Sequence, residues 1–221
     1  CTAELPDPGG DAPKARGFLA AFAPAPEAEA EDETTRPKLP RPLAEATLSG
    51  GTIRVAGPDG YCIDPITAKS SAARGFALLA SCHVLSSGDV GRPVPPVLMT
   101  VTVGPRGGAA DLPEAASIAD VAGAELLAER RDGGLVLVNL ATGGRAGLPK
   151  GDPRHWRGAF VQNDRLIGLA LYAPQGSAQA GPGGAALLRS LHARIAALSG
   201  EDAPPETAEG QTGLLGRLFN P

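Results

Sequence analysis

Residues 60–85, GYCIDPITAKSSAARGFALLASCHVL, hold both internal cysteines of the chain, Cys62 and Cys82. They also contain one of its most apolar short runs, Phe76–Ala80. We expect two strands here, joined by a polar crossing and clasped by a Cys62–Cys82 disulfide. Closing a loop of roughly 20 residues in this way stabilises a fold by about 3 kcal/mol on the chain-entropy model.

Other roles for these cysteines stay open at this point. Together with His83 they could hold a metal ion, or they could be a redox pair or free thiols. The spacing contains no Cys-x-x-Cys, and Ser81-Cys82-His83 lacks the first cysteine of a haem-attachment motif. We therefore expect a structural disulfide, with no metal and no cofactor.

Working outward, apolar alternation and turn residues predict further strands and helices. The sequence predicts strands at 52–56, 61–64, 76–85 and 97–103, a short helix at 113–122, hairpins at 124–140 and 156–172, and a helix at 185–198. Strands and helices do not alternate in this order. The expected fold is an α+β domain, with an antiparallel sheet and a short and a C-terminal helix packed on one face.

Charge and proline divide the chain into three parts. Residues 1–48 contain 5 Lys and Arg against 9 Asp and Glu, residues 49–199 contain 14 against 11, and residues 200–221 contain 1 against 4. We predict a lipid-anchored, disordered, acidic Pro-rich linker over 1–48, one α+β domain over 49–199, and a disordered tail over 200–221. The small positive charge of the middle part argues against nucleic acid as a partner.

The first residue, Cys1, is followed by Thr2-Ala3-Glu4 and a stretch rich in Pro, Gly and Asp. This start resembles a mature bacterial lipoprotein, from which a signal peptide has been removed. The resemblance implies acylation of Cys1 and a membrane as partner through the lipid anchor. It also implies the periplasmic side of a bacterial membrane, and Thr2 in place of Asp favours the outer membrane. Two remaining cysteines agree with an oxidising compartment.

The second half of the middle part, from Trp156 on, has a strand, a tight turn, a second strand, a loop and a final helix. With Gly57-Pro58-Asp59-Gly60-Tyr61 as an early strand entry, it resembles domains of the Mog1/PsbP type. A second resemblance rests on the combination of Gly60-Tyr61-Cys62-Ile63-Asp64, Phe76 to Cys82, and Trp156-Arg157 with Arg165-Leu166. This combination resembles an uncharacterised family of bacterial envelope proteins, which implies no known activity.

Two apolar islands of similar shape interrupt the polar arms, at 17–24 (GFLAAFAP) and 213–221 (GLLGRLFNP). Such segments are typical of short docking motifs that enter a groove. They could equally fold back on their own domain or match by chance. The partner-docking candidates are Phe18, Leu19, Phe22, Leu214, Leu215, Leu218 and Phe219.

One polar and aromatic cluster could bind an acidic ligand or a glycan, and the same residues could also be a strand entry with solvated charges. The ligand-binding candidates are Asp152, Arg154, His155, Trp156 and Arg157. The sequence contains no Gly-x-Ser-x-Gly and no phosphate loop, and we assign no catalytic residues.

We expect a non-enzymatic lipoprotein that faces the periplasm and acts as an interaction or scaffold module with a protein partner in the cell envelope. The alternative is a small-ligand or glycan-binding module around Trp156, and an enzyme of unrecognised type is a third reading. The discriminating feature is the surface. An interaction module needs an open groove or apolar patch, whereas a ligand module needs a concave polar pocket near Trp156.

Overall fold

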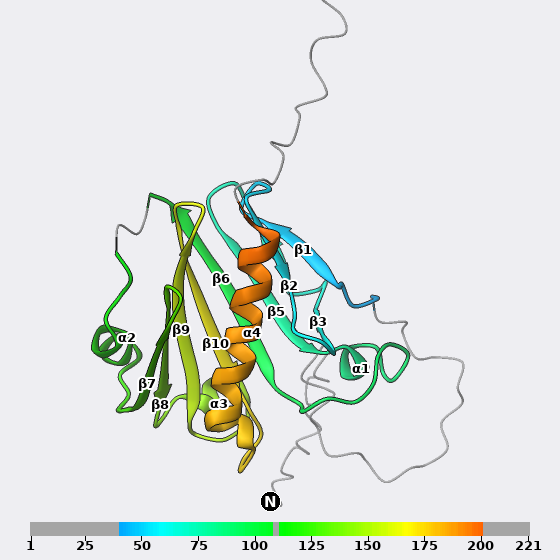
Figure 1. The fold of residues 1–221 in the computed structure, drawn as a ribbon. Coiled ribbons are helices and arrows are strands. Elements are labelled where there is room, and N and C mark those ends of the chain that lie inside the picture. The colour runs from blue at the N-terminus through cyan, green and yellow to red at the C-terminus, as the bar shows by residue number, and fades with distance from the viewer. Residues whose placement is uncertain (1–39, 108–110, 201–221) are drawn as a thin grey trace, which may run out of the picture. The chain divides into compact units, whose positions relative to one another are not determined.

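The computed structural model describes residues 40–107 and 111–200. Their centre is an eight-stranded antiparallel sheet with the order β3-β5-β6-β10-β9-β8-β7 and β4 paired to β5 (Figure 1). Its strands are β3 Tyr61–Ile63, β4 Lys69–Ser70, β5 Gly75–Ser81, β6 Leu98–Arg106, β7 Leu126–Asp132, β8 Leu135–Leu140, β9 His155–Gln162 and β10 Arg165–Tyr172. The antiparallel sheet and the α+β class agree with the sequence prediction.

One face of this sheet carries the main core. Helix α4, Pro182–Leu198, lies across it beside a two-stranded ribbon of β1, Glu45–Leu48, and β2, Ile53–Ala56 (Figure 1). Leu188, Leu191 and Ile195 on α4 are fully buried because their helical spacing turns them toward the sheet. They pack in one cluster with alternate residues of the central strands.

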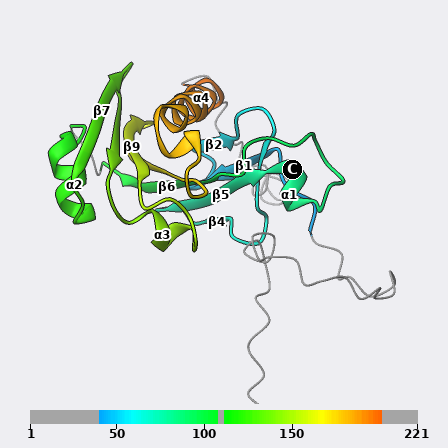
Figure 2. The same ribbon diagram turned by 90° about the horizontal axis from the view of Figure 1, so that it is seen from below.

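Helix α2, Ala115–Ala122, packs on the opposite face, over β7 and β8 (Figure 2). Leu135 and Leu137 of β8 belong to the main core, whereas Val136, Val138 and Leu140 form a second cluster with α2. Successive strand residues point to opposite faces, so this division places α2 and α4 on different sides. The prediction of both helices on one face is therefore wrong.

The face that carries α2 is also covered at one end. The short helix α3, Gly144–Gly147, lies over Tyr172 at the end of β10, so closely that a Cβ at Gly147 would come within 2.4 Å of the Tyr172 ring. Between α2 and β5 the structure places no further element of residues 40–107 and 111–200 over this face. The short 3₁₀ helix Ala178–Ala180 precedes α4.

The 60–85 stretch forms the edge of the sheet. Strand β3 pairs with β5, and Cys62 is joined by a disulfide to Cys82, with a Cα–Cα distance of 4.9 Å. The strand predicted to run to Leu85 instead ends at Ser81. There the Ser81 hydroxyl accepts a hydrogen bond from Val84 N, and the chain turns into α1, Cys82–Leu85.

The structure differs from the sequence prediction at two further segments, neither of which contains a strong apolar run. Strand β1 lies inside the range predicted as linker, so the folded part begins before Ser49. The two-residue strand β4 lies within the polar crossing that the sequence predicts between the two strands of residues 60–85. Cys1 and the docking candidates of both islands lie outside the described residues.

Candidate functional site

The uncovered part of the sheet forms a shallow trough, whose floor consists of side chains from three neighbouring strands. Pairing brings Thr102 of β6 opposite Gly168 of β10, and Gly168 opposite Ala159 of β9. One step along the strands, Thr100 lies opposite Ala170. We call this surface the trough and define its floor by Thr100, Thr102, Ala159, Gly168 and Ala170.

The floor is low because its side chains are small. On the other face the same strands carry large apolar side chains such as Ile167 and Leu169, which belong to the core. A Cβ built on Gly168 would meet no atom within 4 Å, so open space lies directly above it. The trough is therefore a groove into which side chains of another segment could pack.

Helix α2 forms one wall of the trough. Pro113, Ile118 and Val121 line a hollow of about 440 Å³ together with the floor and Leu166. Val121 is 91% exposed, the most exposed of the large hydrophobic side chains in the described part of the chain. An isolated exposed valine is ordinary, but one at the rim of an apolar groove indicates a contact surface.

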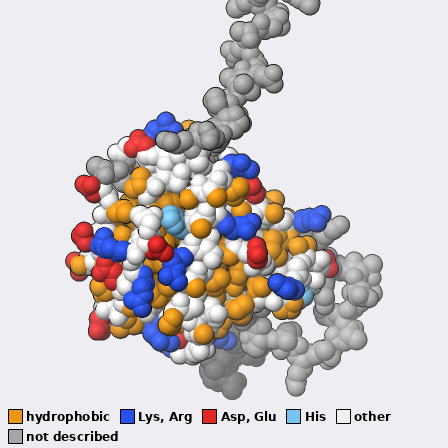
Figure 3. All heavy atoms as spheres, in the orientation of Figure 1, with side chains coloured by type: hydrophobic (Ala, Val, Ile, Leu, Met, Phe, Trp, Pro, Cys, Tyr) orange, Lys and Arg blue, Asp and Glu red, His pale blue; other side chains and the backbone are white. Residues whose placement is uncertain are grey.

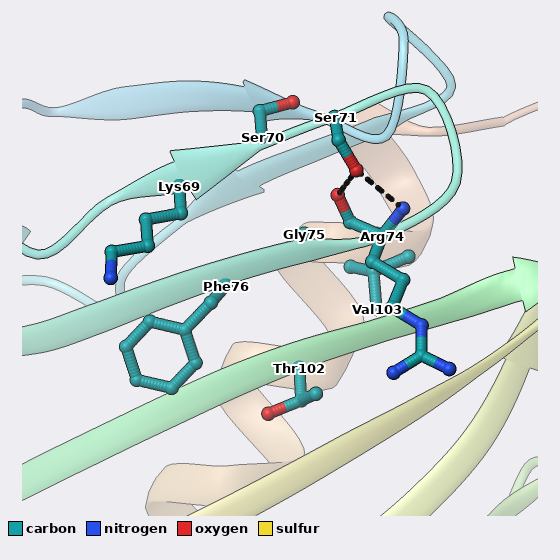
Figure 4. Close-up of a pocket in the computed structure, with 8 residues that line it drawn as sticks. All are labelled: Lys69, Ser70, Ser71, Arg74, Gly75, Phe76, Thr102 and Val103. Atoms are coloured by element: carbon teal, nitrogen blue, oxygen red, sulfur yellow. Dashed lines mark hydrogen bonds between the residues drawn. The ribbon is translucent and has the colours of Figure 1, made fainter.

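The opposite wall is basic. Lys69, Arg74 and Phe76 line a second hollow of about 320 Å³, which shares Thr102 with the first. Figure 4 shows the Phe76 ring beside the Lys69 side chain, with the Arg74 guanidinium on the other side of Thr102. Neither hollow has an Asp or Glu among its described lining residues, so the charged side chains that line the two hollows are all basic.

A third cation stands on the trough's α3 side. Arg157 is exposed, and its Nε donates a hydrogen bond to Nε2 of the buried His155 at 3.3 Å. The His155 ring stacks on Tyr172 with ring centroids 5.4 Å apart. Burial, helped by the positive charge of Arg157, lowers the pKa of His155 to about 4. The imidazole is thus neutral at pH 7 and can accept the hydrogen bond that positions Arg157.

The other predicted ligand-binding residues are structural in this fold. Trp156 is 2% exposed, and its indole Nε1 donates to Gly181 O at 2.8 Å, which anchors the start of α4 to the sheet. Asp152 is buried and accepts hydrogen bonds from Arg154 N, from the Arg154 guanidinium and from Gly176 N. These contacts, chiefly the Arg154 side chain, lower the pKa of Asp152 to about 2.

The structure thus divides the predicted cluster. Asp152 and Arg154 hold two loops together, Trp156 lies in the core, and only Arg157 reaches the trough. Polar and aromatic composition suggested one binding surface, but alternation along β9 turns Trp156 and Arg157 to opposite faces.

The opposite side of the molecule offers a different surface. Figure 3 shows the side that carries α4, on which hydrophobic, basic and acidic side chains are intermixed. Among residues 40–107 and 111–200, no three His, Cys, Asp or Glu residues are grouped so that they could hold a metal ion. No helix within the same residues has the length and apolarity needed to cross a membrane.

A search of family models, curated proteins and solved structures returns no match to this chain. The Mog1/PsbP-type resemblance stays a prediction.

The sequence does contain a signal for the trough. In β6, Thr100 and Thr102 alternate with Val101 and Val103, and β10 alternates glycine and alanine with large apolar residues. That pattern predicts one face filled with large side chains and one lined with small ones. Which strands are neighbours depends on long-range pairing, so the pattern of each strand alone could not reveal the groove.

Proposed function

We propose that this domain is a non-enzymatic binding module whose open sheet face receives an acidic protein segment that carries apolar side chains. The observation that carries the proposal is the trough itself, a groove with a floor of small residues, an apolar wall on α2 and basic side chains on the opposite side.

The chemistry of the trough suggests the kind of ligand. Small floor residues leave room for Leu-sized or Phe-sized side chains, whose burial contributes roughly 1.5–3 kcal/mol each. Lys69, Arg74 and Arg157 favour a segment with carboxylates beside those apolar residues, and charge complementarity raises association rates and disfavours basic competitors.

The disulfide supports a place for this module outside the cytoplasm. Disulfides persist in oxidising compartments such as the bacterial periplasm, and Cys62 and Cys82 are paired in this fold. We therefore propose a role in the cell envelope, with an envelope protein as partner. Acylation of Cys1 and an outer-membrane location remain sequence predictions.

A small-ligand site centred on Trp156 finds less support, because the indole is buried and its one polar atom is already hydrogen-bonded to Gly181 O. The exposed position of Arg157 is compatible with binding on the open sheet face as well as with a small-ligand site.

A displayed-peptide selection tests the proposal directly. The immobilised chain, both full-length and ending at Gly200, is exposed to a random peptide library, and the selected peptides are measured against two variants. Gly168→Ile fills the trough at a position with free space above it. Ala193→Leu adds an apolar side chain at an exposed position of α4 and is the matched control.

The proposal predicts acidic peptides with apolar residues that bind the parent chain and Ala193→Leu but bind Gly168→Ile at least tenfold more weakly. Peptides that bind Gly168→Ile as well as the parent would place recognition elsewhere. Failure to select any trough-dependent peptide on either chain would contradict the proposed function.

A further inference from the structure

We propose that the trough is occupied by residues 201–221 of this same chain, so that the module is covered in cis until a competing ligand displaces its own segment. This inference rests on the proposed function and names an occupant for the same surface. Four observations carry it: where the chain leaves the fold, the charges beside that point, the length of the segment and its apolar residues.

The described chain ends beside the tip of the β9–β10 hairpin, on the face of the sheet opposite the trough, so the next residues must pass the end of the hairpin to reach it. Ser199, after the last turn of α4, accepts hydrogen bonds through its carbonyl oxygen from the side-chain amides of Gln162 and Asn163, both at 2.9 Å. These residues lie at the turn that joins β9 to β10. The next residues of the chain therefore start at the tip of the hairpin whose two strands supply three of the five floor residues.

The same hairpin tip is connected to the basic wall. The Arg165 guanidinium, buried beside the β9–β10 turn, donates to the carbonyl oxygens of Ala72, Ala73 and Gly104 at 2.9–3.0 Å. This network fixes the loop before β5, from which Arg74 projects (Figure 4). Arg165 itself is buried and pairs with backbone oxygens, so it positions the wall rather than contacting a ligand.

Charge along the segment matches this path. Glu201, Asp202, Glu206 and Glu209 follow the exit point with no Lys or Arg among them, and Arg217 is the only cation before residue 221. The first carboxylates would leave the fold near the loop that carries Arg74, because Arg165 ties this loop to the same hairpin. Arg74 and Lys69 have no carboxylate among the lining residues of their hollow. Opposite charges at this spacing favour a course over the basic wall rather than into solvent.

The length and the apolar residues of the 201–221 segment also fit the trough. About a dozen residues separate Gly200 from the apolar island, which is enough to span on the order of 40 Å at about 3.3 Å per residue. The floor from Leu166 to Ala170 is only about 13 Å long by the rise of a strand. Leu214, Leu215, Leu218 and Phe219 supply apolar side chains of the size that the floor can accept.

The other island, at 17–24, is less well placed. The chain enters the described fold next to Leu43, which bridges Ile63 of β3 at the edge of the sheet. Strand β5, which carries Phe76 of the basic wall, separates that edge from β6 and the trough floor. The 201–221 segment starts beside the tip of a hairpin whose strands belong to the trough floor, and it carries the stronger excess of negative charge for its length.

Covalent connection makes the cis contact effective even if it is weak. A segment on a linker of this length has an effective concentration on the order of millimolar. An external ligand for the same trough must compete with it, so removing 201–221 is expected to tighten the binding of external peptides.

The test uses the purified full chain with a photo-crosslinking residue, Val121→p-benzoylphenylalanine, at the trough wall. The same probe at exposed Ala193 of α4 is the control. Irradiation and mass spectrometry identify the attached residues, and a mixture of isotopically light and heavy chains separates attachment within one chain from attachment between two. We expect attachment to residues 213–221 of the same chain from position 121 and not from position 193. Adding Lys69→Glu with Arg74→Glu should reduce it severalfold.

Several results would overturn the proposal. Attachment between two chains would make a second copy the occupant, and attachment to 17–24 would transfer the role to the other island. An absence of attachment to 201–221 would leave the trough uncovered by this segment.

The peptide selection keeps this failure separate from failure of the proposed function. If the chain ending at Gly200 binds a trough-dependent peptide no more tightly than the full chain does, the cis contact is absent while the binding function stands. Tighter binding by the shortened chain, by about tenfold or more, supports both.

Discussion

Acid should destabilise this protein in a pH range set by one buried histidine. His155 lies between Tyr172 and Arg157, and its pKa is lowered from 6.5 to about 4 by burial and by the positive charge of Arg157. In the unfolded chain the imidazole takes up a proton as pH falls below 6.5, whereas the folded state resists until about pH 4. The unfolded state therefore binds more protons between these values, and stability decreases as pH decreases.

The size of the effect follows from the two pKa values. A difference of one pKa unit corresponds to 1.36 kcal/mol, so the full loss for His155 is about 3 kcal/mol, of which about 2.5 kcal/mol has occurred by pH 4.5. This contribution is fully retained above pH 6.5. The carboxyl group of Asp152, whose pKa is lowered to about 2, also contributes to the loss of stability in acid, but mainly below pH 4. Between pH 4.5 and pH 7 the contribution of His155 can therefore be measured separately.

The assay is urea unfolding of the parent and of His155→Gln at pH 7 and at pH 4.5. Glutamine does not titrate and keeps an oxygen that can accept the hydrogen bond from Arg157. In the parent the free energy of unfolding should be lower at pH 4.5 than at pH 7. We expect His155→Gln to show only a small part of this decrease. His192→Gln is the control, since burial also lowers the pKa of His192 and its share must be separated. An unchanged pH dependence in His155→Gln would refute the reasoning.

Three further variants test the contacts that shape the domain. Replacing Cys62 and Cys82 together by alanine should lower the free energy of unfolding by roughly 3 kcal/mol relative to the oxidised parent. Urea unfolding measures this difference, with the chemically reduced parent as control, and an effect below 1 kcal/mol would contradict it. Arg165→Leu should cost about 2–5 kcal/mol because it leaves several buried carbonyls without donors, and a mild effect like that of a surface change would argue against this network. Gly184→Ala should lower the thermal midpoint, because its Cβ would come within 2.6 Å of the Trp156 ring, and an unchanged midpoint would show that α4 can shift freely.

Local patterns predicted the hairpins well. Asn163 and Asp164 both adopt positive φ, as do Gly133 and Gly134, which is the geometry of tight hairpin turns. Their sequence chemistry sufficed to place the turns and therefore the strand pairs on either side.

Features that depend on contacts between distant parts of the chain could not be predicted from local sequence patterns. The placement of α2 on the face opposite α4 depends on which side of β8 each helix buries, and both sides of β8 are apolar. The strand ending at Ser81 was predicted too long because Cys82–Leu85 is apolar enough for either conformation, and the Ser81 cap decides it. The cluster around Trp156 was read as one surface because composition does not reveal burial.

The most direct test of the central claim is a nuclear magnetic resonance map of peptide binding. A ¹⁵N-labelled chain ending at Gly200 is titrated with the strongest peptide from the selection, and the amide shifts are assigned to elements. The open-face account predicts the largest shifts in β6, β9, β10 and α2 around Thr102 and Gly168, and small shifts in α4. Shifts centred on α4 or on the loops around Asp152, with Thr102 and Gly168 unmoved, would contradict it.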